Sequence, residues 1–452
     1  MKIQVRGHAC VTKILLTTGL LVTLYAARAE DDLWRAITGG KPDLFVRYRF
    51  ENVEDSQRPL LQDAYANTVR TALGYSTGLF HDIGAYAQFE DVRVLGDDDF
   101  NDGGQNGHTS RALVVDPQGT ELQQANLRYR GIPKTQIWLG RQEIEHRQAP
   151  FHRFVGNVPW RQNWQSFDGL RITNDSLPAL HVDYAFVWDV NRIFGEDNPL
   201  PDRAHFHLDG HLIDLTYRGL PGITLEPYAY LLAFDSQSLA TRLLSTATYG
   251  VRAQGSYDVI PWAAKVLYTA EFAHQRDYGH DNPVAIDVNY YLVELGATKL
   301  INNPWLESVT LKGSYEVLGG DGTTAVGKAT VGRAFQTPLA TGHAFQGWAD
   351  RFLTTPADGV RDLFGTLAVK VAGANLAFIY HDFRSDHDDY AYGGEWDVQL
   401  TRTFLDHYTA GIKYASYSAD DDPLNRARNG LKSSGKQAFD LDKIWLWTEL
   451  RF

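Results

Sequence analysis

The sequence predicts an all-β fold: a transmembrane, antiparallel, up-and-down barrel of about eighteen strands with short periplasmic turns and long extracellular loops. Segments of about ten residues alternate apolar and polar side chains, which suits strands between lipid and a polar lumen. Short and long connections also alternate, as in outer-membrane barrels. A β-sandwich or a propeller gives no reason for that alternation.

The N-terminus has the order of a secretory signal peptide, with a basic start, an apolar run and an A-x-A cleavage site. These parts are Lys2, Arg6 and Lys13, then 14–26, then Ala27-Arg28-Ala29. The apolar run is too short to span a bilayer as a helix. We therefore expect a signal peptide at residues 1–29 and one barrel at residues 30–452, located in the cell outer membrane.

Composition excludes several classes of protein. The chain has a formal net charge of −12, and the signal peptide carries basic but no acidic residues, so the mature chain is more acidic still. Nucleic-acid binding needs a basic footprint and is not expected. The only cysteine, Cys10, lies in the signal peptide, which excludes a disulfide framework and a cysteine-ligated metal in the mature chain.

The final strand shows the alternation most clearly. One parity is apolar except for a threonine, while the other mixes charged residues with tryptophan. The first set is Ile444, Leu446, Thr448, Leu450 and Phe452, and the second is Lys443, Trp445, Trp447, Glu449 and Arg451. Similar segments occur throughout the chain, and we assign their apolar parity to lipid and their polar parity to the lumen.

Eight short turns separate nine hairpin-like units, which gives eighteen strands with both termini on the short-turn side. The turns are expected near Gly78-Asp82, Gly131-Lys134, Asn174-Pro178, Gly219-Gly222, Asp258-Pro261, Asn302-Trp305, Gly373-Asn375 and Leu405-His407. The longer polar stretches include 94–120, 143–166, 190–210, 318–359 and 418–441. No short-side turn is long enough to form a periplasmic plug.

The candidate functional residues are the charged residues whose side chains the alternation directs into the lumen. The basic members are Arg47, Arg49, Arg70, Arg128, Arg171, Arg252, Lys265, Lys312 and Lys413. The acidic members are Glu51, Glu90, Asp183, Glu271, Glu294, Glu316 and Glu395. The first six strands are richer in the basic set, so one arc of the wall is expected to attract anions. The alternative is that these charges pair across the lumen.

Other motifs do not support enzymatic or metal chemistry. The segment from Gly322 to Lys328 resembles a P-loop, but Ala329 replaces the Ser or Thr that would hold Mg²⁺. Asp97-x-Asp99-x-Asn101 resembles the start of an EF-hand loop, but Asp102 replaces the required glycine and His108 the bidentate glutamate, which leaves a weak cation site in this acidic loop as an alternative. We expect no catalytic site, no cofactor and no metal site. A zinc site at His205, His207 and His211 with Asp209 remains an alternative.

Several motifs resemble those of the alginate export family of outer-membrane proteins, over nearly the whole mature chain. They are Arg49-Phe50-Glu51-Asn52, Thr71-Ala72-Leu73-Gly74-Tyr75, Phe89-Glu90-Asp91-Val92-Arg93, Leu139-Gly140-Arg141-Gln142, Trp160-Arg161-Gln162-Asn163, Phe167-Asp168-Gly169 and His343-Ala344-Phe345-Gln346-Gly347-Trp348-Ala349-Asp350. The resemblance implies an eighteen-stranded barrel that passes an anionic polysaccharide through an arginine-rich constriction. It also implies contacts with outer-membrane lipid and with periplasmic export machinery.

At positions matching the family, the constriction candidates are Arg49, Arg70, Arg93, Arg128, Arg141 and Arg171, and we expect Arg47, Glu90, Arg252 and Lys265 to line the same pore. Arg141 shares the parity of Leu139, so its inward direction needs a bulge or the strand end. We expect diffusion of an anionic polysaccharide or acidic sugar. A porin for small anions or oligosaccharides is the first alternative, and an outer-membrane hydrolase or an adhesin is the second. Loop 337–356 either narrows the channel or caps it.

Overall fold

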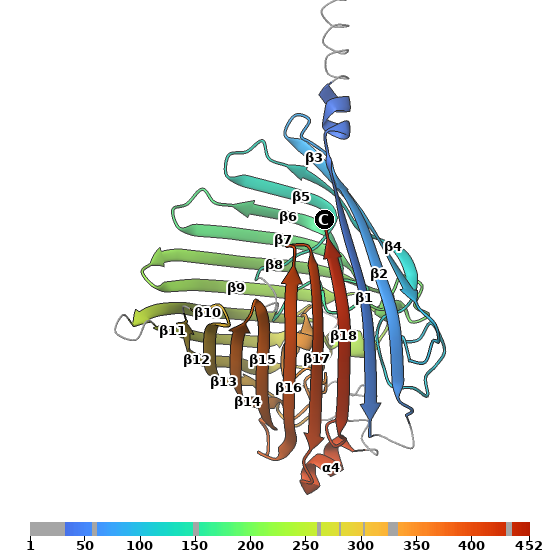
Figure 1. Ribbon diagram of the computed structural model, residues 1–452, viewed down its shortest axis with the longest axis vertical. Helices are drawn as coiled ribbons and strands as arrows, with labels where there is room; N and C mark the ends of the chain where they lie inside the picture. Colours follow the sequence, from blue (N-terminus) through green and yellow to red (C-terminus); the bar gives the residue numbers. More distant parts are fainter. Residues whose placement is uncertain are drawn as a thin grey trace, which may run out of the picture.

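The structure, a computed structural model, describes residues 32–56, 61–147, 153–259, 264–279, 282–301, 303–323, 333–430 and 436–452. The expected signal peptide and most of the P-loop-like segment lie outside these residues. Eighteen strands form one closed sheet (Figure 1). They are β1 (Lys41–Asp55), β2 (Ala64–Ser76), β3 (Ile83–Val94), β4 (Gly119–Tyr129), β5 (Thr135–Gln142), β6 (Ser166–Asn174), β7 (Leu180–Asn191), β8 (His205–Leu220), β9 (Ile223–Phe234), β10 (Thr246–Val259), β11 (Ala264–Asp277), β12 (Asp287–Leu300), β13 (Leu306–Leu318), β14 (Val360–Val371), β15 (Ala374–Arg384), β16 (Ala391–Phe404), β17 (Tyr408–Ala419) and β18 (Leu441–Arg451).

Each strand pairs antiparallel with its neighbours in sequence, and β1 closes the barrel against β18. The closing register runs from Phe45 opposite Arg451 to Asp55 opposite Leu441. Closure removes the exposed sheet edges that would otherwise invite pairing with other chains. The predicted strand number and the up-and-down order are confirmed.

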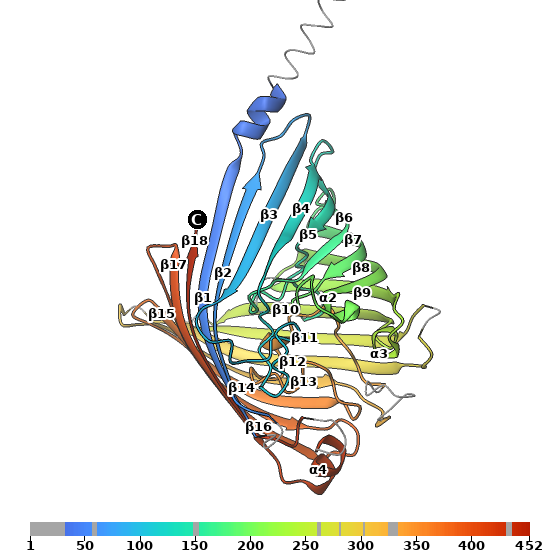
Figure 2. The same ribbon diagram turned by 90° about the vertical axis from the view of Figure 1, so that its right-hand side faces the viewer.

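The predicted alternation of connections is also confirmed, because all eight short turns fall between strands where the sequence places them. At the turn between β14 and β15, Ala372 and Gly373 have φ values of +49° and +74°. Two successive positive φ values are typical of the tight turns that match strand twist. In Figures 1 and 2 the C-terminus and the short helix at residues 32–38 lie toward one end, and helix α4 (Pro423–Asn429) lies toward the other.

The two faces of the sheet differ as the alternation predicts. On β12, Val293 and Leu295 are 58% and 62% exposed, whereas Tyr290 on the opposite parity is fully buried. Exposed apolar side chains continue around the outside at Leu73, Phe89, Leu127, Leu139, Leu311, Leu363, Trp396 and Leu446. A continuous outer belt of this kind is what a barrel wall needs against a bilayer. No helix in the described residues is long and apolar enough to cross a membrane.

The lumen is partly filled by long-loop segments that pack on the inward face. Phe154 lies against Tyr228, Tyr290 and Phe335, with ring centroids 5.1, 5.5 and 6.1 Å away. The remaining short helices also belong to long loops: α2 (Pro201–Ala204), α3 (Leu239–Arg242) and the 3₁₀ turn η2 (Gly342–Ala344). The interior is therefore built from two layers, a strand wall and inserted loops.

Candidate functional site: the constriction and the vestibule

Most of the predicted pore residues lie on inward faces. They are Arg47, Arg49, Arg70, Glu90, Arg128, Arg171, Arg252 and Lys265. The register brings the first four together, because Arg47 is directly opposite Arg70 and Arg70 forms an ion pair with Glu90. The others are spread along β4, β6, β10 and β11.

Arg47, Arg49 and Arg70 bind a loop segment, residues 153–165, which we call the first inserted loop. Arg47 donates from Nη1 to the carbonyl of Pro159 at 2.7 Å and from Nε to the Gln162 side chain at 2.9 Å. Arg70 donates to the carbonyl of Gln162 at 2.9 Å, and Arg49 donates to the carbonyl of Trp160. These three arginines therefore hold the loop against β1 and β2.

Other inward cations are also compensated. Arg171 donates from Nε to Asp183 at 3.0 Å, and Arg252 lies 3.0 Å from Glu271. Lys265 pairs with Asp258 at 3.6 Å near a short turn. These ion pairs agree with the alternative explanation, in which the inward charges compensate one another inside the lumen.

Arg128 differs from the other inward arginines. Its guanidinium lies 4.7 Å from the centroid of the Tyr86 ring, and its Nε donates to Asn126 at 3.0 Å. Within the described residues it has no carboxylate at ion-pair distance. Arg128 therefore has no direct ion-pair partner, and the carboxylate that attracts it, Asp43, is bound to the hydroxyl of the same Tyr86 ring.

Arg93 does not line the pore, so that expectation is corrected. The strand β3 alternates without interruption from Phe89 to Arg93, and this puts both side chains on the outward face. Arg93 is 53% exposed and lies 2.6 Å from Asp91. Arg141 lies near the end of β5 and is doubly compensated, by Asp168 at 2.9 Å and Glu196 at 2.7 Å.

A second inserted loop, residues 333–351, runs alongside the first. Val155 forms a parallel bridge with Leu339, and the N–H of Val158 donates to the Thr341 hydroxyl at 3.2 Å. The Trp160 and His343 rings stack with centroids 4.6 Å apart and planes 4° from parallel. Loop 337–356 thus folds inward, which answers the question that the sequence leaves open.

Ion pairs attach both loops to the wall. In the first loop, Arg153 pairs with Glu316 of β13 at 2.8 Å, and Arg161 pairs with Glu51 of β1 at 3.2 Å. In the second loop, Arg351 pairs with Asp55 at 3.1 Å. Because β1 and β13 are far apart in the sheet order, the loops reach across the lumen and narrow it.

Asp350 is the centre of the contact between the loops and the wall. It accepts from His343 Nδ1 at 2.8 Å and from Lys443 at 2.7 Å, and it lies 3.6 Å from Arg161. The ammonium of Lys413 lies 3.1 Å from His343 Nε2. A neutral imidazole with its proton on Nδ1 satisfies both neighbours, since it donates to Asp350 and accepts from Lys413.

Acid should weaken this contact. Burial lowers the pKa of His343 to about 3 despite the Asp350 carboxylate, so the folded state keeps the ring neutral. The pKa of Asp350 is also lowered, by His343 and Lys443, which outweigh burial. As pH falls below 6.5, the imidazole becomes protonated in the unfolded state but stays neutral in the folded state. The free energy of unfolding therefore decreases toward pH 3. At pH 5 we expect a loss of about 2 kcal/mol from His343.

This expectation can be checked by thermal unfolding of the detergent-solubilised protein between pH 7.5 and pH 4. His343→Gln should flatten the pH dependence, because an amide donates and accepts without titrating. It should not remove the dependence, since burial also lowers the pKa of His146 to about 4. Equal pH dependence in both proteins would contradict the neutral-imidazole assignment.

A cavity of about 1450 Å³ lies on the long-loop side of the inserted loops. Arg161, His343, Asp350 and Lys443 form part of its lining, and the same residues make the contact between the loops and the wall, which we call the constriction. Its other walls come mainly from the loops that follow β7, β9, β13 and β17. We call this cavity the extracellular vestibule.

Sequence reasoning did not assign a role to the loop residues that build the constriction. Trp160, Arg161, His343 and Asp350 lie within segments that carry the family resemblance, which was the available signal. Their pairing with Glu51, Lys413 and Lys443 depends on contacts between residues far apart in sequence. No local pattern encodes such contacts.

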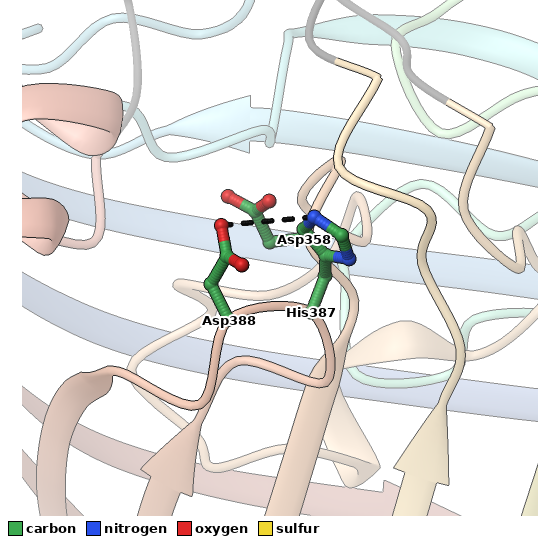
Figure 3. A group of neighbouring side chains, drawn as sticks. All are labelled: Asp358, His387 and Asp388. Atoms are coloured by element: carbon green, nitrogen blue, oxygen red, sulfur yellow. Dashed lines mark ion pairs between the residues drawn. The ribbon is translucent and has the colours of Figure 1, made fainter.

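Two possible metal clusters can be judged from their geometry. Asp358, His387 and Asp388 lie together (Figure 3), with ligand atoms within 4.8 Å of one another. However, Arg428 donates to both carboxylates, at 2.7 and 2.5 Å, where a cation would bind. The three predicted histidines are not brought together, since His205 and His207 both contact Asp189 while His211 faces Tyr184.

Comparisons with known proteins agree with this architecture. Among solved structures, Pseudomonas aeruginosa OpdK with vanillate has a TM-score of 0.65 at 14% identity, covering 92% of this chain and 99% of that one. Acinetobacter baumannii OccAB4 has a TM-score of 0.64 at 14% identity, covering 91% and 98%. No curated protein sequence matches significantly. The sequence profile named "Alginate export" matches residues 43–354, and the chain therefore belongs to the alginate export family.

Proposed function

We propose that this outer-membrane channel passes an anionic solute, an acidic polysaccharide or a smaller acidic sugar. The membership of the family and the barrel fold support a channel and no enzyme. The observation that carries the anion preference is Arg128 on the inward face, which has no direct ion-pair partner among the described residues. A wide barrel encloses water, and a fixed charge inside it favours ions of opposite sign.

The paired arginines refine the expectation from sequence. Arg47, Arg49 and Arg70 donate hydrogen bonds to the first inserted loop. They therefore affect the solute indirectly, by fixing the position of that loop in the lumen. We propose that Arg128 and, on the opposite wall, Lys312 of β13 set the field that a passing anion meets, whereas Lys413 is buried against Trp160 and His343. Lys312 pairs with Glu294 at 3.1 Å, whereas Arg128 has no such ion pair among the described residues, so we assign the larger contribution to Arg128.

Planar-bilayer recording tests the proposal. The wild type should conduct in discrete steps with anion preference, and Arg128→Glu should lower or reverse the preference because it replaces a cation by an anion in the lumen. Arg93→Glu is the matched control, since Arg93 lies on the outward face. Equal selectivity in all three proteins would contradict the proposal.

A porin for small acids is the second candidate. OpdK, whose fold this barrel shares, was solved with vanillate, an aromatic carboxylate. The inserted loops narrow the lumen, and a narrow path suits a small solute better than a hydrated polymer. Block of the channel current by added solutes distinguishes the two candidates. Block by acidic oligosaccharides but not by the monomeric acids would favour passage of a polymer.

A further inference from the structure

The extracellular vestibule has an imbalance between its carboxylates and its cations. Three of its carboxylates already have partners: Asp55 pairs with Arg351, Asp350 with Lys443, and Asp358 with Arg428. A fourth, Asp202, accepts from the hydroxyls of Ser236 and Thr241, each at 2.5 Å. The fifth, Asp235, is exposed.

Arg192 and Arg203 in the same lining have no such compensation. Arg192 follows β7, and Arg203 belongs to α2; neither has a carboxylate at ion-pair distance among the residues that the structure describes. Their hydrogen bonds go to backbone carbonyls, Arg192 to Asp202 at 2.7 Å and Arg203 to Gly103. The buried Nε of Arg192 has no acceptor.

Electrostatics agrees with an unmet need for negative charge. Burial and the nearby Arg203 lower the pKa of Arg192 to about 9, and the attraction of Asp202 does not offset them. The pKa of Lys436, across the same lining, is also lowered, mainly by burial and Arg351, with a further contribution from Arg203. Arg203 thus disfavours the charged forms of both Arg192 and Lys436, and an anion bound in the cavity would relieve both.

Aromatic rings hold Arg192 in place. Its guanidinium lies 3.8 Å from the centroid of Phe206 and 5.0 Å from that of Phe194, and Arg203 lies 5.6 Å from Phe194. Stacking fixes the plane of a guanidinium while leaving its edge free for a carboxylate. Phe194 and Phe206 also offer an apolar surface beside the charges.

We propose that Arg192, Arg203 and Lys436 form a carboxylate-binding site in the extracellular vestibule, which captures an acidic solute from outside before it meets the constriction. The site rests on the proposed function and deepens it, because it assigns the side from which the solute is recognised. The cavity is large enough for a sugar acid or an aromatic acid. Both classes share the carboxylate that the arginines would bind.

Binding is measured on the purified, detergent-solubilised full chain by calorimetric titration with glucuronate, benzoate and uncharged glucose. Either acid should bind saturably, and the tighter one identifies a sugar-acid or an aromatic-acid site. Arg203→Gln and Lys436→Gln should each weaken binding, with the larger effect, about tenfold, for Arg203. Lys436 belongs to the loop between α4 and β18 and not to the strand wall, so its variant should fold normally.

Arg426→Gln is the control, because Arg426 is 62% exposed, pairs with Asp421 and lies outside the cavity lining. Unchanged binding in both cavity variants, or equal binding of glucose, would overturn the site. In bilayers, the acid should block at lower concentration from the extracellular side, and symmetrical block would also overturn it. If the acids neither bind nor block asymmetrically while anion selectivity is retained, the vestibule site is wrong and the proposed function stands. If the protein does not conduct at all, the proposed function itself is wrong.

Discussion

Arg161→Ala is expected to release the inserted loops and to raise the unitary conductance of the channel. Arg161 is buried, and it pairs with Glu51 at 3.2 Å while lying 3.6 Å from Asp350 and 3.9 Å from Asp116. The carboxylates hold the pKa of Arg161 above its usual value in spite of burial. Without the guanidinium, three buried carboxylates lose a shared counter-charge at the contact between loops and wall.

The size of the effect follows from the cost of an uncompensated buried charge. Removing one partner of a buried pair typically costs about 3–5 kcal/mol. We therefore expect larger and noisier current steps, and faster proteolysis at Arg333 and Arg351 in the second loop. Arg426→Ala removes an exposed arginine and should change neither measurement. Unchanged conductance in Arg161→Ala would mean that the loops do not limit the channel.

The fold could be predicted from sequence because its information is local. A strand's two faces repeat every second residue, so Ile444 to Phe452 reveals the outward side of β18 without knowledge of its neighbours. Turns are equally local, as the positive φ values at Ala372 and Gly373 show. Eighteen strands then follow from counting turns, and closure follows from the need to satisfy β1 and β18.

The site could be predicted only in part. Parity places Arg47, Arg70 and Arg128 inward, but it does not say what occupies the lumen beside them. Arg93 shows one limit, since matching a family motif does not override the direction that alternation gives a side chain. A second limit is that the sequence does not reveal the hydrogen bonds from Arg47 and Arg70 to the carbonyls of the first inserted loop. Such contacts join residues about a hundred positions apart, and no window of sequence contains both partners.

Gly347→Ala is expected to dislodge the tip of the second inserted loop from β16. Gly347 has a φ of +77°, and a Cβ atom there would overlap the Glu395 carboxylate. The adjacent N–H groups donate to the same wall, Trp348 to Asp397 at 3.2 Å and Ala349 to Glu395 at 2.6 Å. The left-handed backbone should cost about 1–2 kcal/mol, and overpacking against a buried carboxylate about 1–3 kcal/mol more.

A second glycine separates these two costs. Gly107 has a φ of +76°, but nothing lies within 4 Å of the position that its Cβ would take. Gly107→Ala should therefore show the backbone strain alone, with a modest fall in the unfolding temperature and unchanged conductance. Gly347→Ala should show a larger fall together with irregular current steps, because the tip also loses its two hydrogen bonds to β16. Identical behaviour of the two variants would mean that the loop tip tolerates a side chain, and that its docking on Glu395 does not shape the channel.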